Sequence, residues 1–175
     1  MASGDVAMRI LAAVLVASSV AGSGIRQPAR EGYLDALEGR WRTEAIHLYA
    51  DGERLVEQGD VNCGWILERT YLRCDRRHRS QSAERLSQQL YVQNTASERV
   101  EMLTLAAGRA ARVLLIAESS ARPLVFVGTI PAASGSRSIR GTATVETRNR
   151  IVYRNEVEDR PNRWRTDYIE TYIRR

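Results

Sequence analysis

From Leu37 onward, the sequence is a series of short segments that suit β-strands, separated by residues that favour turns. Short strands at regular spacing with turn signals between them are typical of all-β domains. Most connections are short, which predicts a single antiparallel up-and-down β-barrel of about 8–10 strands. The expected strands cover residues 39–49, 61–67, 70–76, 85–94, 100–106, 112–119, 123–131, 138–146, 150–158 and 163–174, and residues 33–37 are expected to form one helical turn that plugs an end.

The length and composition agree with one globular domain. The chain has 175 residues, of which 43% are hydrophobic and 27% charged, and these values exclude a disordered or collagen-like chain. Two cysteines are too few for a disulfide-dense miniprotein, and too few for a four-ligand zinc site without histidines. We expect a barrel domain over residues 37–175, a flexible spacer over residues 22–36, and no cofactor or metal.

The N-terminal residues have the layout of a secretory signal peptide. Arg9 is followed by an apolar or small stretch from Ile10 to Ala17, and small residues surround Ala21. The stretch is shorter than the roughly 20 residues that span a bilayer. We therefore expect residues 1–21 to be a signal peptide that is cleaved after Ala21, and the protein to be periplasmic or secreted with no stable membrane insertion. An uncleaved membrane anchor is the alternative.

The basic residues are all arginine, and they give the chain a formal net charge of +5. They are scattered along the chain, and a GC-rich genome explains the lack of lysine, so we expect no nucleic-acid partner. The one dense cluster contains Arg73, Arg76, Arg77, Arg79 and His78. We interpret it as a solvated strand end and loop, and a patch for anionic envelope polymers or lipid head groups is the alternative.

The last two expected strands predict a hairpin with a defined register. Residues 159–162 are a strong turn signal. One register places opposite charges across one face and aromatic or apolar residues across the other, and a slip of one residue breaks both patterns. In that register the charged pairs are Glu158–Arg163, Glu156–Arg165 and Arg154–Asp167, and the other face carries the pairs Val157–Trp164 and Tyr153–Tyr168.

A second hairpin centres on Glu68 and Arg69, and its register places Cys63 opposite Cys74. An exported protein folds under oxidising conditions, so we expect a Cys63–Cys74 disulfide, with two free thiols as the alternative. A two-residue turn would place the cysteines at a hydrogen-bonded pair of positions. A four-residue loop would place them at the closer, non-hydrogen-bonded pair, which suits a disulfide better.

Several residues are candidates for a ligand site inside the barrel. His47 shares a strand face with Trp41 and is either a ligand contact, a proton acceptor or a hydrogen-bonded core histidine. The aromatic face of the last hairpin is either packed core or a ligand wall, and Glu170 and Arg165 are candidates for inward polar groups. The candidate ligand-binding set is His47, Trp65, Tyr153, Trp164, Tyr168 and Glu170.

The other acidic residues give no recognisable catalytic or metal-binding pattern. The group Asp51, Glu53, Glu57 and Asp60 lacks the spacing of an EF-hand, so we interpret it as a solvated loop rather than a calcium site. Most strand carboxylates face water. We expect this of the carboxylates in or beside the strands other than Glu170, namely Glu98, Glu101, Glu118 and Glu146.

Two short motifs at the ends of the barrel domain indicate a family. Gly39, Arg40 and Trp41 form a Gly-x-Trp motif in the first strand, and the last strand ends in Arg174 and Arg175. Together they resemble the calycins, the superfamily of lipocalins and fatty-acid-binding proteins. By this resemblance Trp41 closes the barrel bottom and Arg174 packs across its indole, with Arg165 as the alternative partner. Such a contact contributes about 0.5–2 kcal/mol.

Further motifs are similar to those of small exported bacterial lipocalin-like domains of unknown function. These are an acidic-glycine turn at Asp51-Gly52 and a tryptophan-bearing hairpin over residues 65–72. The related nitrobindin-like proteins bind haem through a histidine. Here the last strands contain no histidine, so haem is not expected.

The sequence and the resemblance together predict an exported barrel that binds a small hydrophobic or amphipathic molecule without catalysis. The alternative is a filled barrel that acts as an envelope or interaction protein and has no small-molecule ligand. A third reading is a small enzyme on the same fold, which requires an inward cluster of titratable groups with shifted pKa values.

Overall fold

The chain folds into a closed antiparallel barrel, as the sequence predicts. The computed structural model of the protein describes residues 32–94, 96–97, 99–107, 112–118, 123–132 and 135–175. Each strand pairs with its neighbours in the chain, and β1 also pairs with β10, which closes the barrel. The elements are α1 (Tyr33–Leu37), β1 (Gly39–Leu48), β2 (Arg54–Ile66), β3 (Tyr71–Arg79), β4 (Glu84–Asn94), β5 (Arg99–Ala106), β6 (Arg112–Glu118), β7 (Leu124–Ala132), β8 (Gly135–Thr147), β9 (Arg150–Arg160) and β10 (Arg163–Arg174).

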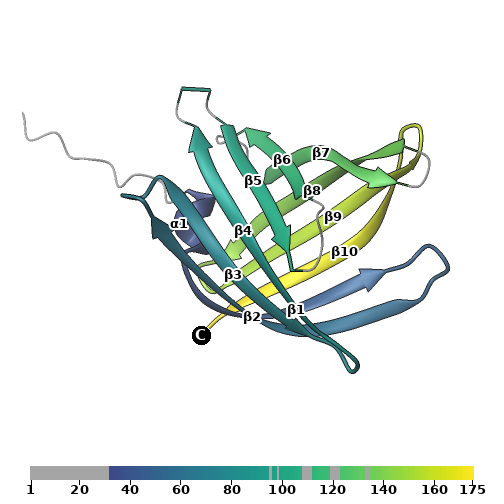
Figure 1. Cartoon of the computed structure of the whole chain (residues 1–175), viewed down its shortest axis with the longest axis horizontal. Coiled ribbons are helices and arrows are strands. Elements are labelled where there is room, and N and C mark those ends of the chain that lie inside the picture. Colours follow the sequence, from purple (N-terminus) through teal and green to yellow (C-terminus); the bar gives the residue numbers. More distant parts are fainter. Residues whose placement is uncertain (1–31, 95, 98, 108–111, 119–122, 133–134) are drawn as a thin grey trace, which may run out of the picture.

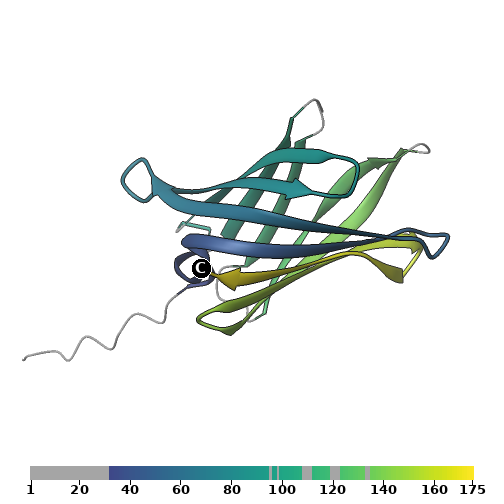
Figure 2. The same ribbon diagram turned by 90° about the horizontal axis from the view of Figure 1, so that it is seen from below.

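The two ends of the barrel differ. Helix α1 lies at one end, here called the α1 end (Figure 1). The turns that join β1 to β2 and β9 to β10 lie at the opposite end, here called the far end, and the perpendicular view agrees (Figure 2). Tyr33, Leu34 and Leu37 of α1 are buried, so the helix covers apolar interior at its end. The last part of the predicted 22–36 spacer, residues 33–36, therefore belongs to a packed helix.

The α1 end is closed by Trp41 and Arg174. Trp41 is fully buried, and its Nε1 donates a hydrogen bond of 2.7 Å to the backbone oxygen of Leu37. The Arg174 guanidinium lies 4.2 Å from the centroid of the indole. Its Nη1 donates to the backbone oxygen of Glu38. Gly39 has φ +125, and a Cβ there would lie 2.6 Å from Arg174 Nη1, so this position requires glycine for both reasons.

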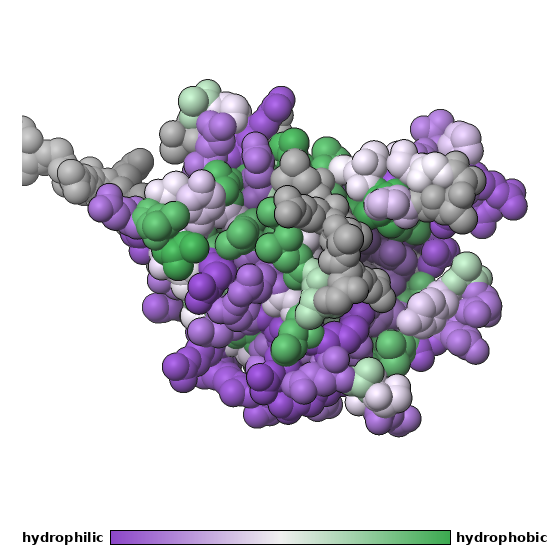
Figure 3. Space-filling view, in the orientation of Figure 1, coloured by the Kyte–Doolittle hydropathy of each residue, from purple (hydrophilic) through white to green (hydrophobic). Residues whose placement is uncertain are grey.

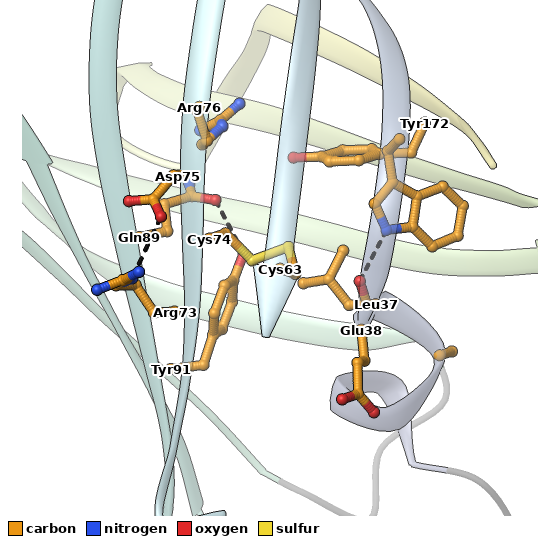
Figure 4. Close-up of a disulfide and its surroundings, with 12 residues drawn as sticks. Leu37, Glu38, Cys63, Arg73, Cys74, Asp75, Arg76, Gln89, Tyr91 and Tyr172 are labelled. Atoms are coloured by element: carbon orange, nitrogen blue, oxygen red, sulfur yellow. Dashed lines mark hydrogen bonds and ion pairs between the residues drawn. A yellow bond between two sulfur atoms is a disulfide. The ribbon is translucent and has the colours of Figure 1, made fainter. Parts of the chain in front are cut away.

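The predicted disulfide between Cys63 and Cys74 is confirmed. The two cysteines are directly opposite on β2 and β3, and their Cα atoms are 4.0 Å apart. The loop between these strands has four residues, 67–70, which is the length that suits the pairing. Both cysteines are buried, and they lie in the barrel interior between Arg76 and Tyr172 on one side and Leu37 and Tyr91 on the other (Figure 4).

The predicted register of the last hairpin is wrong. Trp164 lies opposite Glu158 and Arg165 opposite Val157, one residue away from the expected pairs. The turn is shorter than expected: Arg160 pairs with Arg163, and Asn162 between them has φ 63. A Pro-Asn pair suits a two-residue turn that needs a positive φ at its second position. The charge ladder expected for residues 154–167 therefore does not form.

Two irregularities account for the rest of the difference, one with its extra residue in β9 (Asp159) and one with its extra residue in β10 (Asp167). The register shifts between Arg163 and Trp164, and again between Thr166 and Tyr168. An extra residue in one strand turns the residues beyond it to the other face. Asp167 is the unpaired residue at the second shift, and its Oδ1 accepts a hydrogen bond of 2.8 Å from Asn155 Nδ2. As a result Trp164 does not share a face with Tyr168.

Strands β2 and β3 are longer than expected. Strand β2 begins at Arg54 rather than at residue 61, and β3 continues to Arg79 rather than ending at residue 76. The polar composition of residues 54–60 suggested a solvated loop, but Glu57 is buried in the barrel. The arginine cluster on β3 is divided by strand alternation: Arg76 and His78 are buried, whereas Arg77 is exposed with its neighbours on the outer face. The interpretation of the whole cluster as solvated is therefore wrong for Arg76 and His78.

The outer surface is mainly hydrophilic over the lower part of the face in Figure 3, where β2 and β3 run. Hydrophobic side chains gather above that region. Within the described part of the chain, no helix has the length and hydropathy needed to cross a membrane.

Candidate functional site

A pocket of about 530 Å³ lies at the far end of the barrel and is lined mainly by inward-facing residues. Polar and charged side chains form much of its wall, with small residues of β5 beside them. We call this cavity the upper pocket. It is lined by His47, Arg76, His78, Glu84, Arg85, Leu86, Ser87, Thr104, Ala106, Ala107 and Tyr168.

On the side of the upper pocket toward the α1 end, Glu170 is the centre of a buried hydrogen-bond network. Its Oε2 accepts hydrogen bonds from the hydroxyls of Tyr168 and Tyr172, both at 2.8 Å, and a bond from Arg76 Nη2. Its Oε1 lies 2.8 Å from Nε2 of His78. Glu170 is fully buried and Arg76 is 8% exposed. A buried carboxylate with a paired guanidinium and further hydrogen bonds meets the conditions under which a buried charge is tolerated.

The network sets the charge of Glu170. Burial opposes ionisation, but the guanidinium of Arg76 and the hydrogen bond from His78 outweigh it, so the pKa of Glu170 lies well below its ordinary value. Burial raises the pKa of Tyr172 and Tyr168 well above the ordinary value. It also raises the pKa of Tyr91 to about 12. The carboxylate is therefore ionised and the surrounding phenols are protonated donors at neutral pH.

A second group of charges lies nearer to solvent. Glu57 is buried, and its Oε2 accepts a hydrogen bond from Arg85 Nη2 and lies 3.1 Å from Nε2 of His47. Burial raises the pKa of Glu57, but the hydrogen bonds from Arg85 and His47 and their charges outweigh this effect, so the net change in the pKa is downward. The His47 ring also packs on Tyr168, with 4.8 Å between ring centroids. The arginines and histidines of two Arg–Glu–His groups thus line the upper pocket, and their glutamates, Glu57 and Glu170, are buried beside them.

Backbone geometry makes room for His78. Gly59 lies directly opposite His78 on β2, and a Cβ there would come within 2.6 Å of His78 Cδ2 and 2.7 Å of Thr43 Oγ1. His78 Nε2 contacts both Thr43 Oγ1, at 3.2 Å, and Glu170. A nucleophile triad needs the two ring nitrogens to face different partners. Because one nitrogen faces both, Thr43, His78 and Glu170 do not form such a triad.

The structure brings together four of the six predicted ligand-site residues. Two of them, His47 and Tyr168, line the upper pocket. Glu170 accepts a hydrogen bond from Tyr168 on the side of the pocket toward the α1 end. Tyr153 is buried on β9 and packs against Tyr168, with ring centroids 6.4 Å apart. Tyr153, Tyr168, Glu170 and Tyr172 share the inner face, with Tyr153 opposite Glu170 rather than opposite Tyr168.

The two tryptophans of the predicted set lie elsewhere. Trp65 is opposite Leu72 near the α1 end, under the guanidinium of Arg69 at 4.8 Å. Trp164 is opposite Glu158 and carries Arg140 over its ring at 4.5 Å. Arg165, predicted as an inward polar group, donates from Nη1 to the backbone oxygen of Leu48 at 2.8 Å.

Sequence reasoning missed the charged partners of the pocket, namely Arg76, His78, Glu57 and Arg85. A signal for two of them was present. Once Cys74 is placed inward by its disulfide, strand alternation also places Arg76 and His78 inward. Arg85 lies opposite His78 on β4 and so shares its inward face, where it pairs with Glu57. To place Glu57 inside the barrel, one would have had to recognise that β2 begins before residue 61.

Of the other strand carboxylates, Glu146 bonds Arg150 on the surface, with 2.5 Å from Oε2 to Arg150 Nε. Glu101 lies opposite Ile116 and is partly buried. Glu98 and the side chain of Glu118 lie outside the described residues. Within the described ranges, no three His, Cys, Asp or Glu side chains are grouped so that they could hold a metal ion. The predicted signal peptide over residues 1–21 also lies outside the description.

No protein-family model and no curated protein matches this sequence. Among solved structures, an S-type phycobiliprotein lyase from Guillardia theta is similar, with a TM-score of 0.55 and 11% sequence identity over 82% of this chain and 90% of that chain. A designed fluorescence-activating β-barrel also matches, with a TM-score of 0.43 and 14% identity over 81% of this chain and 96% of that chain. The lyase comparison, at this identity, shows a common barrel fold.

Proposed function

We propose that this protein is an exported, lipocalin-like barrel that binds a small hydrophobic or amphipathic molecule in the upper pocket without catalysis. The observation that supports binding is the pocket itself, because its volume of about 530 Å³ lies within the range of small-molecule sites. The polar side chains on its wall suit the polar end of an amphipathic molecule. The buried disulfide supports export, since disulfides persist in oxidising compartments.

The barrel is divided between a filled part and an open part. Large side chains, including Trp41, Tyr91, Phe126 and Leu115, are fully buried in the core. A filled interior is what the alternative of a non-binding envelope or interaction protein requires. The upper pocket favours the binding function instead, because it leaves space for a ligand between the charged groups and the far end.

Blocking the pocket tests this function. Ala106 is an inward-facing residue of β5 that lines the pocket, so Ala106→Trp fills part of the cavity. We expect the variant to bind the neutral probe N-phenyl-1-naphthylamine at least about tenfold more weakly than the unmodified protein, a loss of about 1.4 kcal/mol. The measurement is a fluorescence titration. Val127→Trp is the control, because Val127 is 54% exposed on the outside of β7. Equal losses in both variants, or no probe binding by the unmodified protein, would contradict the proposal.

Native mass spectrometry of the protein exported with its own N-terminal segment tests export and a resident ligand together. We expect the mass of residues 22–175 with the Cys63–Cys74 disulfide formed, and a second species that carries a small molecule. A mass that still contains residues 1–21 would contradict cleavage after Ala21. A wholly ligand-free mass would favour the filled-barrel alternative.

A small enzyme on this fold is a second candidate, favoured by the cluster of ionisable groups at the pocket. Glu57 and Glu170 have lowered pKa values, and each contacts a histidine. His47→Gln distinguishes the candidates, because it leaves binding of an apolar probe largely intact in a carrier and abolishes turnover in an enzyme that uses His47 as its acid or base.

A further inference from the structure

The charged side chains around the upper pocket balance one another. Arg85 is matched by Glu57, Arg76 by Glu170, and Glu84 by Arg77 on the outer face of β3, so the set carries no net charge when both histidines are neutral. An additional anion that entered this pocket would have no compensating charge. Burying an unpaired charge is costly. An anionic ligand therefore has to bring a positive charge with it or create one in the pocket.

His47 is placed to supply that charge. Its Nε2 lies 2.8 Å from Arg85 Nη2 and 3.1 Å from Glu57 Oε2. A guanidinium only donates hydrogen bonds and a carboxylate only accepts them. Without a hydrogen, Nε2 can accept a hydrogen bond from Arg85. With a hydrogen, it can donate one to Glu57, and it cannot do both at once. While Arg85 stays in this position, either the Arg85 contact or the Glu57 contact of Nε2 is therefore not a hydrogen bond.

We propose that the upper pocket takes up a carboxylate-bearing amphipathic molecule together with one proton, which binds at Nε2 of His47. The carboxylate pairs with Arg85, whose side chain is 45% exposed and can reach toward the far end. Protonated His47 then replaces Arg85 as the donor to Glu57. The charge is conserved, because Arg85 neutralises the ligand while imidazolium neutralises Glu57. This inference rests on the proposed function of the upper pocket.

Arg76 offers a further donor. It lines the same pocket and is 8% exposed, and its Nε has no hydrogen-bond partner in the part of the chain that the structure describes. A buried donor without a partner costs stability. Arg76 and Arg85 are the two guanidiniums on the β3–β4 side of the pocket, and Arg85 is the more exposed of the two.

Histidine is the side chain that changes charge near neutral pH, and its surroundings decide the coupling. His47 is flanked by Leu55 on β2 and by Tyr168 on β10. The titratable and charged groups around it are Glu57 on β2, Arg76 and His78 on β3, Glu84 and Arg85 at the start of β4, and Arg165, Asp167 and Tyr168 on β10.

The test compares decanoate with decanol, which have the same chain length and differ in head-group charge. Isothermal titration calorimetry at pH 7.2 in two buffers of different ionisation enthalpy, Pipes and Tris, gives both affinity and proton uptake. We expect decanoate to bind at least about tenfold more tightly than decanol, because charge-assisted hydrogen bonds hold its head group. We also expect net proton uptake on binding of decanoate, with one proton as the upper limit because a single imidazole takes it, and none on binding of decanol.

Variants assign the proton and the anion contact. His47→Gln is expected to abolish proton uptake, and Arg85→Gln to reduce the affinity for decanoate to that for decanol. Arg54→Gln is the control, because Arg54 is an exposed arginine opposite Leu48 at the same end of the barrel and does not line the upper pocket.

The outcomes separate the two proposals. Equal binding of decanoate and decanol, or decanoate binding without proton uptake in the unmodified protein, overturns the inference and leaves the proposed binding function standing. Proton uptake that persists in His47→Gln overturns the assignment to His47. Failure of the unmodified protein to bind decanoate, decanol and N-phenyl-1-naphthylamine overturns the proposed function, and the inference with it.

Discussion

Glu170→Gln is expected to lower the free energy of unfolding by about 3–5 kcal/mol, the usual cost of removing one partner from a buried ion pair. The substitution keeps the size of the side chain but removes its charge. Arg76 is then left buried with an unpaired guanidinium, and the bonds from Tyr168 and Tyr172 lose their charged acceptor. Urea denaturation at pH 7 measures the change.

Matched variants show whether the lost charge pair is the cause. Glu44→Gln on the exposed outer face of β1 is expected to change stability by less than about 0.5 kcal/mol. The double variant Arg76→Met/Glu170→Leu removes both charges, and we expect it to be more stable than Glu170→Gln, because apolar pairs often replace buried ion pairs at little cost. A double variant less stable than Glu170→Gln would contradict this explanation.

The same residue gives the stability a defined pH dependence. The pKa of Glu170 is lower in the folded protein than in the unfolded chain, where the pKa of a glutamate is about 4.3. The stabilisation is therefore complete above that pH and is lost as the pH falls below it toward the folded-state pKa. We expect the difference in unfolding free energy between the unmodified protein and Glu170→Gln to shrink progressively below pH 4.3.

Trp41→Ala is the second large effect, with an expected loss of about 3–5 kcal/mol in the free energy of unfolding. The indole is fully buried at the α1 end, and its removal leaves a cavity beside Tyr172, whose ring centroid lies 6.2 Å away. It also removes the surface against which Arg174 packs. Thermal and urea denaturation both report the loss.

Trp164→Ala is the control for this prediction. Trp164 also carries an arginine over its ring, Arg140 at 4.5 Å, but it is only partly buried on the outside of the barrel. We expect its loss to cost about 1 kcal/mol, in the range of exposed cation–π contacts. Comparable losses in Trp41→Ala and Trp164→Ala would show that burial at the α1 end does not determine the effect.

Local patterns predicted the parts of this fold that depend on neighbouring residues. Strand alternation and turn residues gave the ten strands, and complementary pairs around residues 67–70 gave the register that joins Cys63 to Cys74. The last hairpin shows the limit of that reasoning. Two irregularities, one in β9 and one in β10, displaced a register that the side-chain pattern supported, and nothing in residues 158–168 marks where an extra residue is inserted.

The candidate site was harder to predict because its charges are inside the barrel. Arginine and glutamate are normally exposed, so Arg76 and Glu57 were interpreted as solvated. Their burial is possible only because Glu170 and Arg85 arrive from strands that are distant in sequence. Pairing between distant side chains is a property of the closed barrel, and a single sequence contains no direct signal of it.

Closure of the barrel also has a consequence for how the chain folds. Nine of the ten strand pairs join consecutive strands and bring together residues that are close in sequence, whereas β1 and β10 pair Trp41 with Arg174. Contacts between distant residues form slowly because the intervening chain loses entropy before they form. The first and last strands therefore meet late, after the hairpins between them have assembled. The stacking of Arg174 on Trp41 then stabilises a barrel whose other strand pairs have already formed, and it is not part of the folding nucleus.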